Sequence, residues 1–449
     1  MKAFVFLCLL LVALAGAPTA TQAAPTVTYE VGPGRQYARL SQVAPLVSPG
    51  DLVLVYGNGA TPYEEAQKIL FDRPGTAANP ITIRGVRVNG RRPILSSPAS
   101  ITVEFGANHY VFEGFEATGT TGNHRVLYHH ADNIKIRDTL IRDCPGNGLL
   151  GADEDSGSLL LEYVEVTNCG SGTFEHAIYM ATGLPGAVFR MQFCYLHDNK
   201  GGNGVKSRAN RNEIYYNWIE GSFYHELELI GPDDGTGGTP ESPREDSDVV
   251  GNVLIKRQDF PVIARFGGDG TGQTWGRYRF VNNTVILQAA NATVIRAFEG
   301  IESLELHNNV FANAAGGGVN LVRTVEAEWR NGEAIGGSRN WIPTGSTIPA
   351  GLTQTVQGTN PSFTNLAGND LRPQAGSPLV NAGSDAPATL PAHPFPTPLF
   401  PAGYQPQRTQ VAPGAALVRP RVGITDIGAF EIGVPPTLSL RRFLPAVLR

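Results

Sequence analysis

One short pattern recurs six times in the middle of the chain, and it constrains the fold more than any other feature. The copies are NGLLGA from Asn147, HAIYMA from His176, NGVKSRA from Asn203, HELELI from His225, PVIARF from Pro261 and TVIRAF from Thr293. Alignment places one aliphatic side chain of each copy in a single column: Leu149, Ile178, Val205, Leu227, Ile263 and Ile295. The intervals of 22 to 36 residues are typical of a repeat architecture, in which each copy is one strand of a stacked coil.

The alternation of side chains along a strand predicts a second row that faces outward. Because successive residues point to opposite faces of a strand, an inward aliphatic column leaves its neighbours facing solvent. Parallel strands stack about 4.8 Å apart, so residues far apart in sequence become neighbours on this face. We take the outward row as the candidate functional face: Tyr179, Lys206, Arg208, Glu226, Glu228 and Arg296.

Length and composition favour one elongated solenoid. A chain of 449 residues would ordinarily suggest about three domains, but the repeat runs through its middle. The 53 glycines and 33 prolines suit a chain that turns often, and a hydrophobic content of 41% is enough for a continuous core. A net charge of -5 offers no electrostatic footprint for nucleic acid, which we therefore exclude as a partner.

Residues 1–24 predict export. Lys2 is followed by an apolar run from Ala3 to Ala17 and then by small residues, which is the layout of a secretory signal peptide. The run is shorter than the roughly 20 residues that a membrane-spanning helix needs. We therefore expect a secreted or cell-surface protein with no transmembrane segment after signal removal.

The rest of the chain divides into four segments by the strength of the strand repeat. We expect an N-terminal cap and first rungs over residues 25–108, where one rung is one turn of the coil. Residues 109–318 predict the central coil. The pattern fades over residues 319–432, which are rich in proline and less regular, and residues 433–449 form a tail.

Several rungs carry an asparagine just before a pair of apolar residues. Stacked asparagine side chains can hydrogen-bond along a coil, so we interpret this column as structural. Its members are Asn217, Asn252, Asn283 and Asn309.

Three cysteines recur at rung spacing. Cys144, Cys169 and Cys194 are separated by 25 and 25 residues. In an exported protein this spacing brings Cys144 and Cys169 within disulfide reach. A reduced, buried ladder of three thiols is an equally good interpretation.

The sequence resembles a known family over most of its length. GPGRQYARL followed by SPGDLVLV, the repeated strands, NPSF with DLRPQAGSPLVNAGS, and the closing DIGAFE are similar to right-handed parallel β-helix proteins of the pectin lyase-like superfamily. The resemblance covers roughly Val27 to Ile432 and implies a three-faced coil with a substrate groove along one sheet. Many relatives are polysaccharide lyases or glycoside hydrolases that act on acidic glycans, and others are adhesive. The fold therefore leaves the function open.

The outward row supplies residues for a lyase reaction. A lysine with an arginine on one strand resembles β-helix lyases of the alginate and chondroitin type, and Lys206 and Arg208 alone carry that likeness. Lys206 is our candidate base, if Arg208 and burial lower its pKa. Arg208 is alternatively a bidentate partner for the substrate carboxylate, and Tyr179 or His176 is the candidate acid.

Other residues of the row are candidates for substrate and metal binding. No cofactor is required by this scheme, but calcium is an alternative neutralising group because hard cations prefer several oxygen ligands. The candidate substrate-binding residues are Glu226, Glu228, Arg296 and Trp275, and the candidate calcium ligands are Glu226, Glu228, Asp233 and Asp234.

Three alternatives to a lyase stay open. In the first, the charges of the row form a surface ladder that stabilises strand stacking modestly. In the second, the protein is an inverting hydrolase. Its two carboxylates would be Glu226 or Glu228 with Asp233 or Asp234. A non-catalytic glycan-binding or surface structural protein would use the same face. Our first choice is an enzyme, a polysaccharide lyase that acts as a monomer on an acidic polysaccharide.

Overall fold

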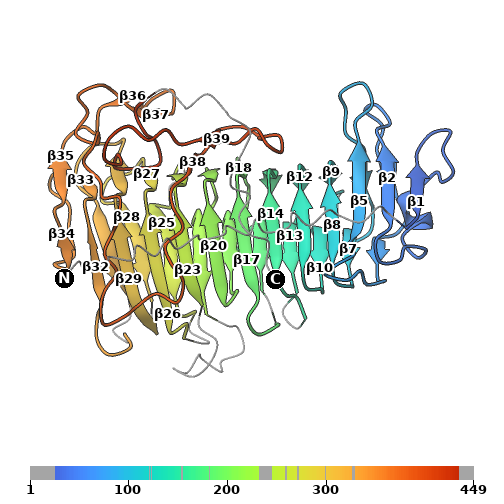
Figure 1. Ribbon diagram of the computed structural model, residues 1–449, viewed down its shortest axis with the longest axis horizontal. Helices are drawn as coiled ribbons and strands as arrows, with labels where there is room; N and C mark the ends of the chain where they lie inside the picture. The colour runs from blue at the N-terminus through green and yellow to red at the C-terminus, as the bar shows by residue number, and fades with distance from the viewer. Residues whose placement is uncertain are drawn as a thin grey trace, which may run out of the picture.

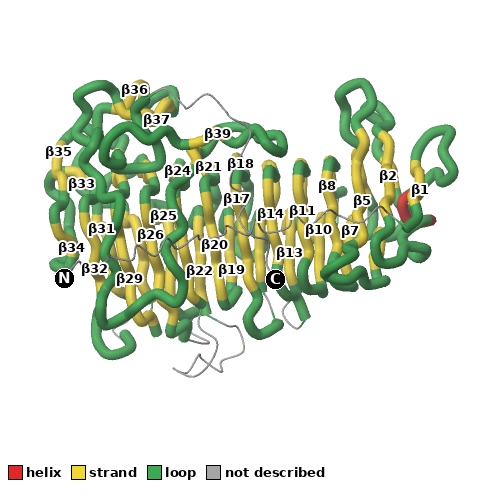
Figure 2. The backbone as a smooth tube through the Cα atoms, viewed as in Figure 1, coloured by secondary structure: helices red, strands yellow, loops and turns green. Residues whose placement is uncertain are grey.

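The computed structural model describes residues 26–433, except 121, 123, 153–154, 182, 232–244, 258–259, 270–272, 299 and 326–328. Within them the chain is a right-handed parallel β-helix, which confirms the predicted fold class (Figures 1 and 2). Three parallel sheets run along the coil, with 13 strands in sheet A, 12 in sheet B and 10 in sheet C. The helical content of the described residues is one 3-10 turn, η1 (Leu40–Gln42). The predicted signal peptide and nearly all of the tail lie outside the described residues.

From β2 to β31 each rung contributes one strand to each sheet in the order A, B, C. Sheet A holds β1 (Thr28–Val31), β2 (Leu52–Tyr56), β5 (Ile81–Val86), β8 (Tyr110–Glu113), β11 (Ile134–Arg137), β14 (Leu159–Glu162), β17 (Val188–Gln192), β20 (Arg211–Tyr215), β23 (Asp246–Val250), β26 (Gly276–Val281), β29 (Ile301–His307), β32 (Ile335–Ser338) and β34 (Leu352–Thr353). Sheet B holds β3 (Tyr63–Glu64), β6 (Ile94–Ser96), β9 (Glu116–Thr118), β12 (Leu140–Cys144), β15 (Glu165–Cys169), β18 (Tyr195–His197), β21 (Trp218–Glu220), β24 (Val253–Ile255), β27 (Thr284–Leu287), β30 (Val310–Asn313), β33 (Trp341–Pro343) and β35 (Val356–Gly358). Sheet C holds β4 (Ile69–Phe71), β7 (Ile101–Phe105), β10 (Arg125–His129), β13 (Asn147–Gly151), β16 (Ile178–Met180), β19 (Val205–Ser207), β22 (Leu227–Ile230), β25 (Val262–Gly267), β28 (Thr293–Ala297) and β31 (Asn320–Thr324).

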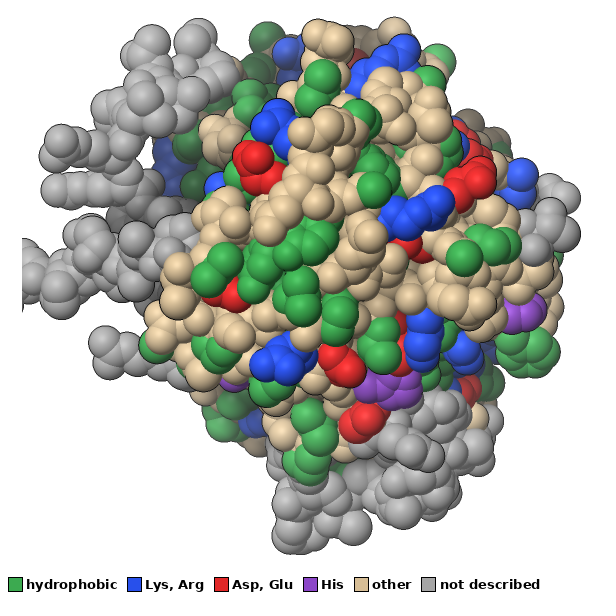
Figure 3. Space-filling view, turned by 90° about the vertical axis from the view of Figure 1, so that its right-hand side faces the viewer, with side chains coloured by type: hydrophobic (Ala, Val, Ile, Leu, Met, Phe, Trp, Pro, Cys, Tyr) green, Lys and Arg blue, Asp and Glu red, His purple; other side chains and the backbone are tan. Residues whose placement is uncertain are grey.

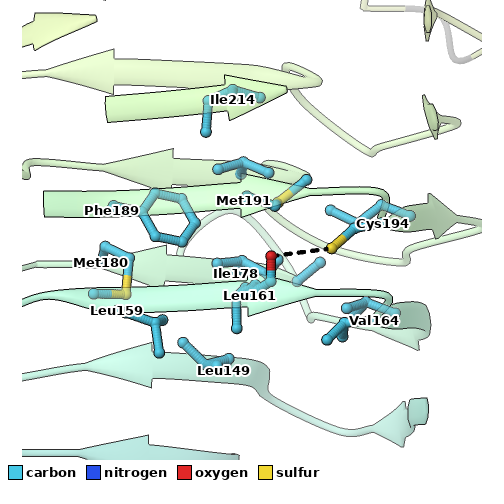
Figure 4. Close-up of a cluster of buried hydrophobic side chains, with 14 of the residues drawn as sticks. Leu149, Leu159, Leu161, Val164, Ile178, Met180, Phe189, Met191, Cys194 and Ile214 are labelled. Carbon is cyan, nitrogen blue, oxygen red and sulfur yellow. Dashed lines mark hydrogen bonds between the residues drawn. The ribbon is translucent and has the colours of Figure 1, made fainter. Parts of the chain in front are cut away.

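Inward side chains from the three sheets fill one continuous core. The close-up in Figure 4 shows Leu149 and Ile178 from sheet C facing Leu161 and Met191 from sheet A. The predicted aliphatic column holds for its first four members, because Leu149, Ile178, Val205 and Leu227 are successive register partners. Full burial of such side chains supplies most of the driving force for stacking.

The predicted column is wrong by one residue at the next rung. Leu227 pairs with Ala264, and Ala264 pairs with Ile295, so Ile263 is not a member. Ile263 and Ala264 are both fully buried, and two aliphatic residues in succession leave the register undetermined in the sequence. A slip of one residue exchanges the two faces of a strand, so Arg265 faces outward.

The asparagine column is structural, as predicted. Asn217 N–H donates to Asn252 Oδ1 at 2.8 Å, and Asn252 N–H donates to Asn283 Oδ1 at 2.9 Å. The ladder continues through Asn309 to Asn340, and each side-chain amide also donates to a backbone carbonyl of a neighbouring rung. Backbone groups at the corner between sheets A and B are thereby satisfied without water.

The cysteine column contains one disulfide and one reduced thiol, so each of the two interpretations holds in part. Cys144 and Cys169 are register partners on β12 and β15, and a disulfide joins them. Cys194 stays a buried thiol, with its sulfur 3.8 Å from the Leu161 carbonyl (Figure 4). Burial raises the pKa of Cys194 to about 12.

The C-terminal region lies back over sheets A and B. Its small hairpins are β36 (Phe363–Asn365) with β37 (Asp370–Pro373), and β38 (Tyr404–Gln405) with β39 (Leu417–Val418). Figure 1 shows this orange-to-red segment returning across the coil. On sheet A the Phe400 ring stacks on Tyr215 at 4.7 Å, and on sheet B Phe363 and Phe430 join an apolar cluster with Trp218.

The N-terminal end of the core is closed by the segment expected to act as a cap. Leu40, Val43, Ala44 and Val47 are buried and belong to the main core. Seen along the coil from this end, hydrophobic side chains lie in small groups among polar atoms (Figure 3). No helix of the described residues is long and apolar enough to cross a membrane.

Candidate active site on sheet C

The outward row of sheet C is a line of register partners with Lys206 in its middle. The C-terminal contacts described above fall on sheets A and B, so within the described residues sheet C is the face without such a cover. The row carries aromatic residues toward the N-terminal end and cations toward the C-terminal end. In order it runs Tyr128, Leu150, Tyr179, Lys206, Glu228, Arg265, Arg296 and Arg323.

Arg208 holds the hydroxyl group of Tyr179 from the next rung. Its Nε donates a hydrogen bond to the Tyr179 hydroxyl oxygen at 3.0 Å. Its terminal nitrogens donate to the Gly231 carbonyl and to Asp269 Oδ2, the latter at 2.6 Å. Burial opposes the charge, but Tyr179 and Asp269 raise the pKa of Arg208 above its usual range. Arg208 is only 4% exposed, so it positions Tyr179 and does not act as an open clamp for a substrate carboxylate.

Asp269 joins two arginines across this face. Oδ2 accepts from Arg208, and Oδ1 lies 2.7 Å from an Arg265 terminal nitrogen. Burial alone would raise the pKa of Asp269, but hydrogen bonding from Arg208 and the charge of Arg265 hold it below its usual range. Asp269 is therefore an ionised carboxylate that links the two arginines, and it is not a proton donor.

Lys206 lies between an aromatic ring and a shared carboxylate. Its Nζ is 4.8 Å from the Tyr179 ring centroid and 3.9 Å from Glu228 Oε2. Glu228 Oε1 accepts from Arg265 at 2.9 Å, and Oε2 accepts from the side-chain amide of Asn203. Glu228 is therefore shared among Lys206, Arg265 and Asn203.

Asn203 sets the proton positions on two histidines. Its backbone N–H donates to His176 Nδ1 at 2.9 Å, which leaves the ring proton of neutral His176 on Nε2. Its Oδ1 lies 3.0 Å from His225 Nδ1 and can only accept, so His225 carries its proton on Nδ1. Burial, with the charges of Lys206 and Arg208, lowers the pKa of His176 to about 3. His176 is therefore neutral at physiological pH, which leaves Tyr179 as the better candidate acid.

The charge order of this row differs from that of a stabilising ladder. On sheet A the outward partners Arg84, Glu113, Arg137 and Glu162 alternate in sign, with ion pairs of 2.6, 3.7 and 3.0 Å between neighbours. On sheet C, Arg265 pairs in register with Arg296, whose next partner is another arginine. Like charges directly opposite each other destabilise a sheet, so this order does not serve stacking.

Glu226 is not part of the outward row, contrary to prediction. Strand β22 begins at Leu227, so the alternation of faces does not extend to Glu226 in the preceding corner. Its carboxylate is fully buried, accepts from the Ser222 N–H at 3.1 Å and lies 3.4 Å from Lys256 Nζ. Burial raises the pKa of Glu226 and lowers that of Lys256.

The remaining predicted residues lie in different places. Arg296 is on the row, two register positions beyond Glu228. Trp275 lies in the turn before β26 of sheet A, where its backbone N–H donates to the Gly300 carbonyl. Asp233 and Asp234 lie outside the described residues. No group of three or more His, Cys, Asp or Glu in the described part of the chain is placed to hold a metal ion.

Four site residues escaped the sequence prediction. The one-residue register error at Ile263 placed Arg265 on the inward face. Alignment of β25 with β28 through their two arginines, Arg265 and Arg296, would have placed it on the outward row. Asn203 and His225 stand in the repeats quoted above, but their mutual hydrogen bonds cannot be read from spacing. Asp269 comes from the loop GGDGTG, and nothing local to that loop indicates that it reaches Arg208.

Comparison with known proteins yields likeness to solved β-helix structures. No family model and no curated protein matches the sequence. An alginate lyase from Paenibacillus sp. str. FPU-7 is 16% identical with a TM-score of 0.44, covering 69% of this chain and 99% of that one. The pectate lyase Pel9A is 13% identical with a TM-score of 0.49, covering 92% and 98%. The PL6 family lyase Pedsa3628 from Pseudopedobacter saltans is 14% identical with a TM-score of 0.41, covering 78% and 96%. Such likeness assigns no role to any residue of this chain.

Proposed function

We propose that this chain is a secreted polysaccharide lyase that cleaves a uronate-containing polymer by β-elimination on the outward row of sheet C. The proposal rests on one observation above all. Lys206 lies beside Tyr179, whose hydroxyl group is held by the buried guanidinium of Arg208. Two groups that can transfer protons are thus neighbours on a cationic face.

The reaction divides between these neighbours. Lys206 removes the C5 proton of a uronate, the C4–O bond breaks, and a C4–C5 double bond forms. Tyr179 gives its proton to the leaving oxygen, and both groups then exchange protons with solvent. Arg208 is a positioning residue, because its donors are bound to Tyr179, Gly231 and Asp269.

Lys206 lies against the ring of the proposed acid. Lys206 Nζ and the Arg208 guanidinium lie 4.8 and 6.0 Å from the centroid of the same Tyr179 ring. The carboxylate beside Lys206, Glu228, is also bound by Arg265 and Asn203. As the base, Lys206 acts in its neutral form when it accepts the C5 proton.

Arginine is the group that we propose to neutralise the substrate carboxylate. Arg296 lies two rungs beyond Glu228, where its planar guanidinium can bind a carboxylate through two hydrogen bonds. Of the predicted calcium ligands, the two in the described part of the chain are already paired, Glu226 with Lys256 and Glu228 with Arg265. No step of the reaction is therefore assigned to a metal.

The decisive experiment is a lyase assay with matched lysine variants. We expect the ultraviolet absorbance of the unsaturated uronate to rise on at least one polymer among alginate, pectate, hyaluronate and chondroitin. Lys206→Ala should abolish the rise, whereas Lys135→Ala, on sheet A, should leave it unchanged. Equal loss in both variants, or activity retained by Lys206→Ala, would refute the assignment of the base.

Two other functions give different outcomes in the same assay. New reducing ends without unsaturation would indicate a hydrolase, but Glu228 and Asp269 are both ion-paired with arginines. Glu226, with its raised pKa, is buried in a corner away from the row. Binding without any cleavage would indicate a glycan-binding protein, which Arg296 and Arg323, without an ion pair to any described acidic residue, also favour.

A further inference from the structure

Three arginines follow one another on the row without an intervening acid. Arg265, Arg296 and Arg323 are successive register partners on β25, β28 and β31, and we call them the arginine stripe. No acidic side chain of the described residues lies within ion-pair distance of Arg296 or Arg323. Burial, with repulsion from Arg265 and Arg323, lowers the pKa of Arg296. Binding of an external anion would therefore reduce the charge repulsion within the arginine stripe.

The hydrogen-bonding capacity of the stripe is also incomplete. The terminal nitrogens of Arg265 bind Glu228 and Asp269, but its Nε is buried without a partner. The Nε of Arg296 is likewise buried without a partner. Both guanidinium groups lie against the Phe298 ring, at 4.1 and 5.0 Å from its centroid, which restricts their motion. Buried donors without acceptors are costly, so the internal contacts of the stripe leave these two guanidinium groups incompletely satisfied.

The opposite half of the row has a different character. On the N-terminal side of Lys206 the next three outward partners are Tyr179, Leu150 and Tyr128, and Glu104 follows them. Aromatic and aliphatic side chains there suit the apolar face of a sugar ring. The two halves therefore differ in charge across Lys206.

We infer that the arginine stripe binds consecutive carboxylates of one polysaccharide chain lying along the coil, and that it fixes the direction of that chain across Lys206. This inference rests on the proposed function and deepens it. Successive rungs present one guanidinium about every 4.8 Å along the axis. A polymer with a carboxylate on every sugar can thus contact several rungs at once, whereas an isolated uronate contacts only one. The aromatic half holds the sugars on the other side of the cleaved bond.

Binding to an inactive protein tests the stripe without depending on catalysis. The background is Lys206→Ala, in which elimination should be absent, and the variant adds Arg296→Gln and Arg323→Gln. The probes are purified oligouronates of two and six sugars, with neutral dextran oligomers and single-stranded DNA as comparisons. The matched control adds Arg84→Gln and Arg137→Gln on sheet A, which removes two arginines from a paired ladder.

We expect the stripe variant to weaken binding of the six-sugar probe by about tenfold for each arginine removed, because a hydrogen bond to a charged group contributes that much. The salt dependence of binding should fall in parallel, and the two-sugar probe should lose less. The control variant should bind like the background. Thermal unfolding of the stripe variant should occur at the same temperature or higher, since a like-charge contact is removed.

The outcomes separate this inference from the proposed function. If the stripe variant binds the six-sugar probe normally while wild type shows lyase activity, the stripe inference fails and the proposed function stands. If the stripe variant loses binding and wild type cleaves nothing, the inference about the arginine stripe is supported and the proposed lyase function is refuted. Equal or tighter binding of DNA by the background protein would overturn the assignment of a polysaccharide ligand.

Discussion

Tyr179 and Arg208 are joined through a 3.0 Å hydrogen bond although 29 residues separate them in the chain. The contact exists because each turn of the coil returns β19 to the side of β16. Arg208 in turn needs Gly231 and Asp269 from later turns to stay in place. The position of one hydroxyl group thus depends on four rungs.

Arg208→Lys should impair catalysis far more than binding. Lysine cannot donate to Tyr179, Gly231 and Asp269 together in the planar geometry of arginine. We expect kcat to fall by about 100-fold with KM nearly unchanged, because several hydrogen bonds to a charged group are lost. Steady-state kinetics would measure this, with Arg142→Lys on sheet B as the control. A rise in KM alone would show that Arg208 binds substrate directly.

The proposed acid and base predict a stereochemical preference. Lys206 and Tyr179 project from the same face of sheet C, so they reach the substrate from one side. Elimination from one side suits uronates whose C5–H and C4–O bonds lie on the same face, as in mannuronate and glucuronate. We expect faster cleavage of mannuronate-rich than of guluronate-rich alginate, measured as initial rates of unsaturated product. Preference for guluronate or galacturonate would contradict the paired roles.

Chelation should leave the enzyme active. Glu228, the predicted calcium ligand that the described residues place on the row, is already bound by Arg265 at 2.9 Å. A calcium ion there would have to displace a guanidinium and then accept repulsion from the arginine stripe. We expect activity after extensive dialysis against EDTA to match that of the calcium-supplemented enzyme. Loss with EDTA and recovery with calcium would instead implicate ligands outside the described residues.

Stability should fall in mild acid because of a buried histidine. His129 is fully buried, and burial lowers its pKa from 6.5 to about 4. Its Nδ1 donates to the Ala131 carbonyl, and no acceptor among the described residues is hydrogen-bonded to Nε2. Since the folded-state pKa is below the unfolded value, this stability is present above pH 6.5 and is lost as pH falls toward 4.

Protonation of His129 lowers the free energy of unfolding by at most roughly 3 kcal/mol, as the shift in its pKa implies. Denaturant unfolding of wild type and His129→Gln at pH 7 and at pH 5 would measure it. We expect the wild type to lose more free energy of unfolding than the variant between the two pH values. Parallel losses would show that other groups dominate.

Reduction of the disulfide should destabilise the coil. Cys144 and Cys169 close a loop of 25 residues, for which a disulfide contributes about 3 kcal/mol. The double variant Cys144→Ser with Cys169→Ser should lower the denaturant midpoint, and reductant should shift wild type in the same direction. Cys194→Ala, which leaves the disulfide intact, should respond to reductant as wild type does. A midpoint unaffected by reductant would contradict the bond.

The fold was predictable because its signal is repeated. Every rung offers the same alternation, so errors at single rungs do not hide the coil, and the column from Leu149 to Leu227 is correct. The site was only partly predictable, because it depends on single residues. One uncertain step at Ile263 was enough to remove Arg265 from the row.

The failure at Glu226 has a different origin. Alternation gives the direction of a side chain only inside a strand, and Glu226 precedes the first residue of β22. Its burial depends on Lys256, which lies 30 residues later in the next corner. A sequence without its contacts cannot reveal such a pair.

The returning C-terminal region changes how the coil can come apart. A stack of turns that touch only their neighbours would open progressively from its last turn. Here Leu390 N–H is bound to Glu305, and Gln410 is bound to both Tyr163 and Arg92, at turns far apart along the axis. Opening the last turns therefore requires release of contacts on early ones. We therefore expect the coil to unfold as one cooperative unit and not progressively from one end. The coil is complete only when the C-terminal region has been synthesised.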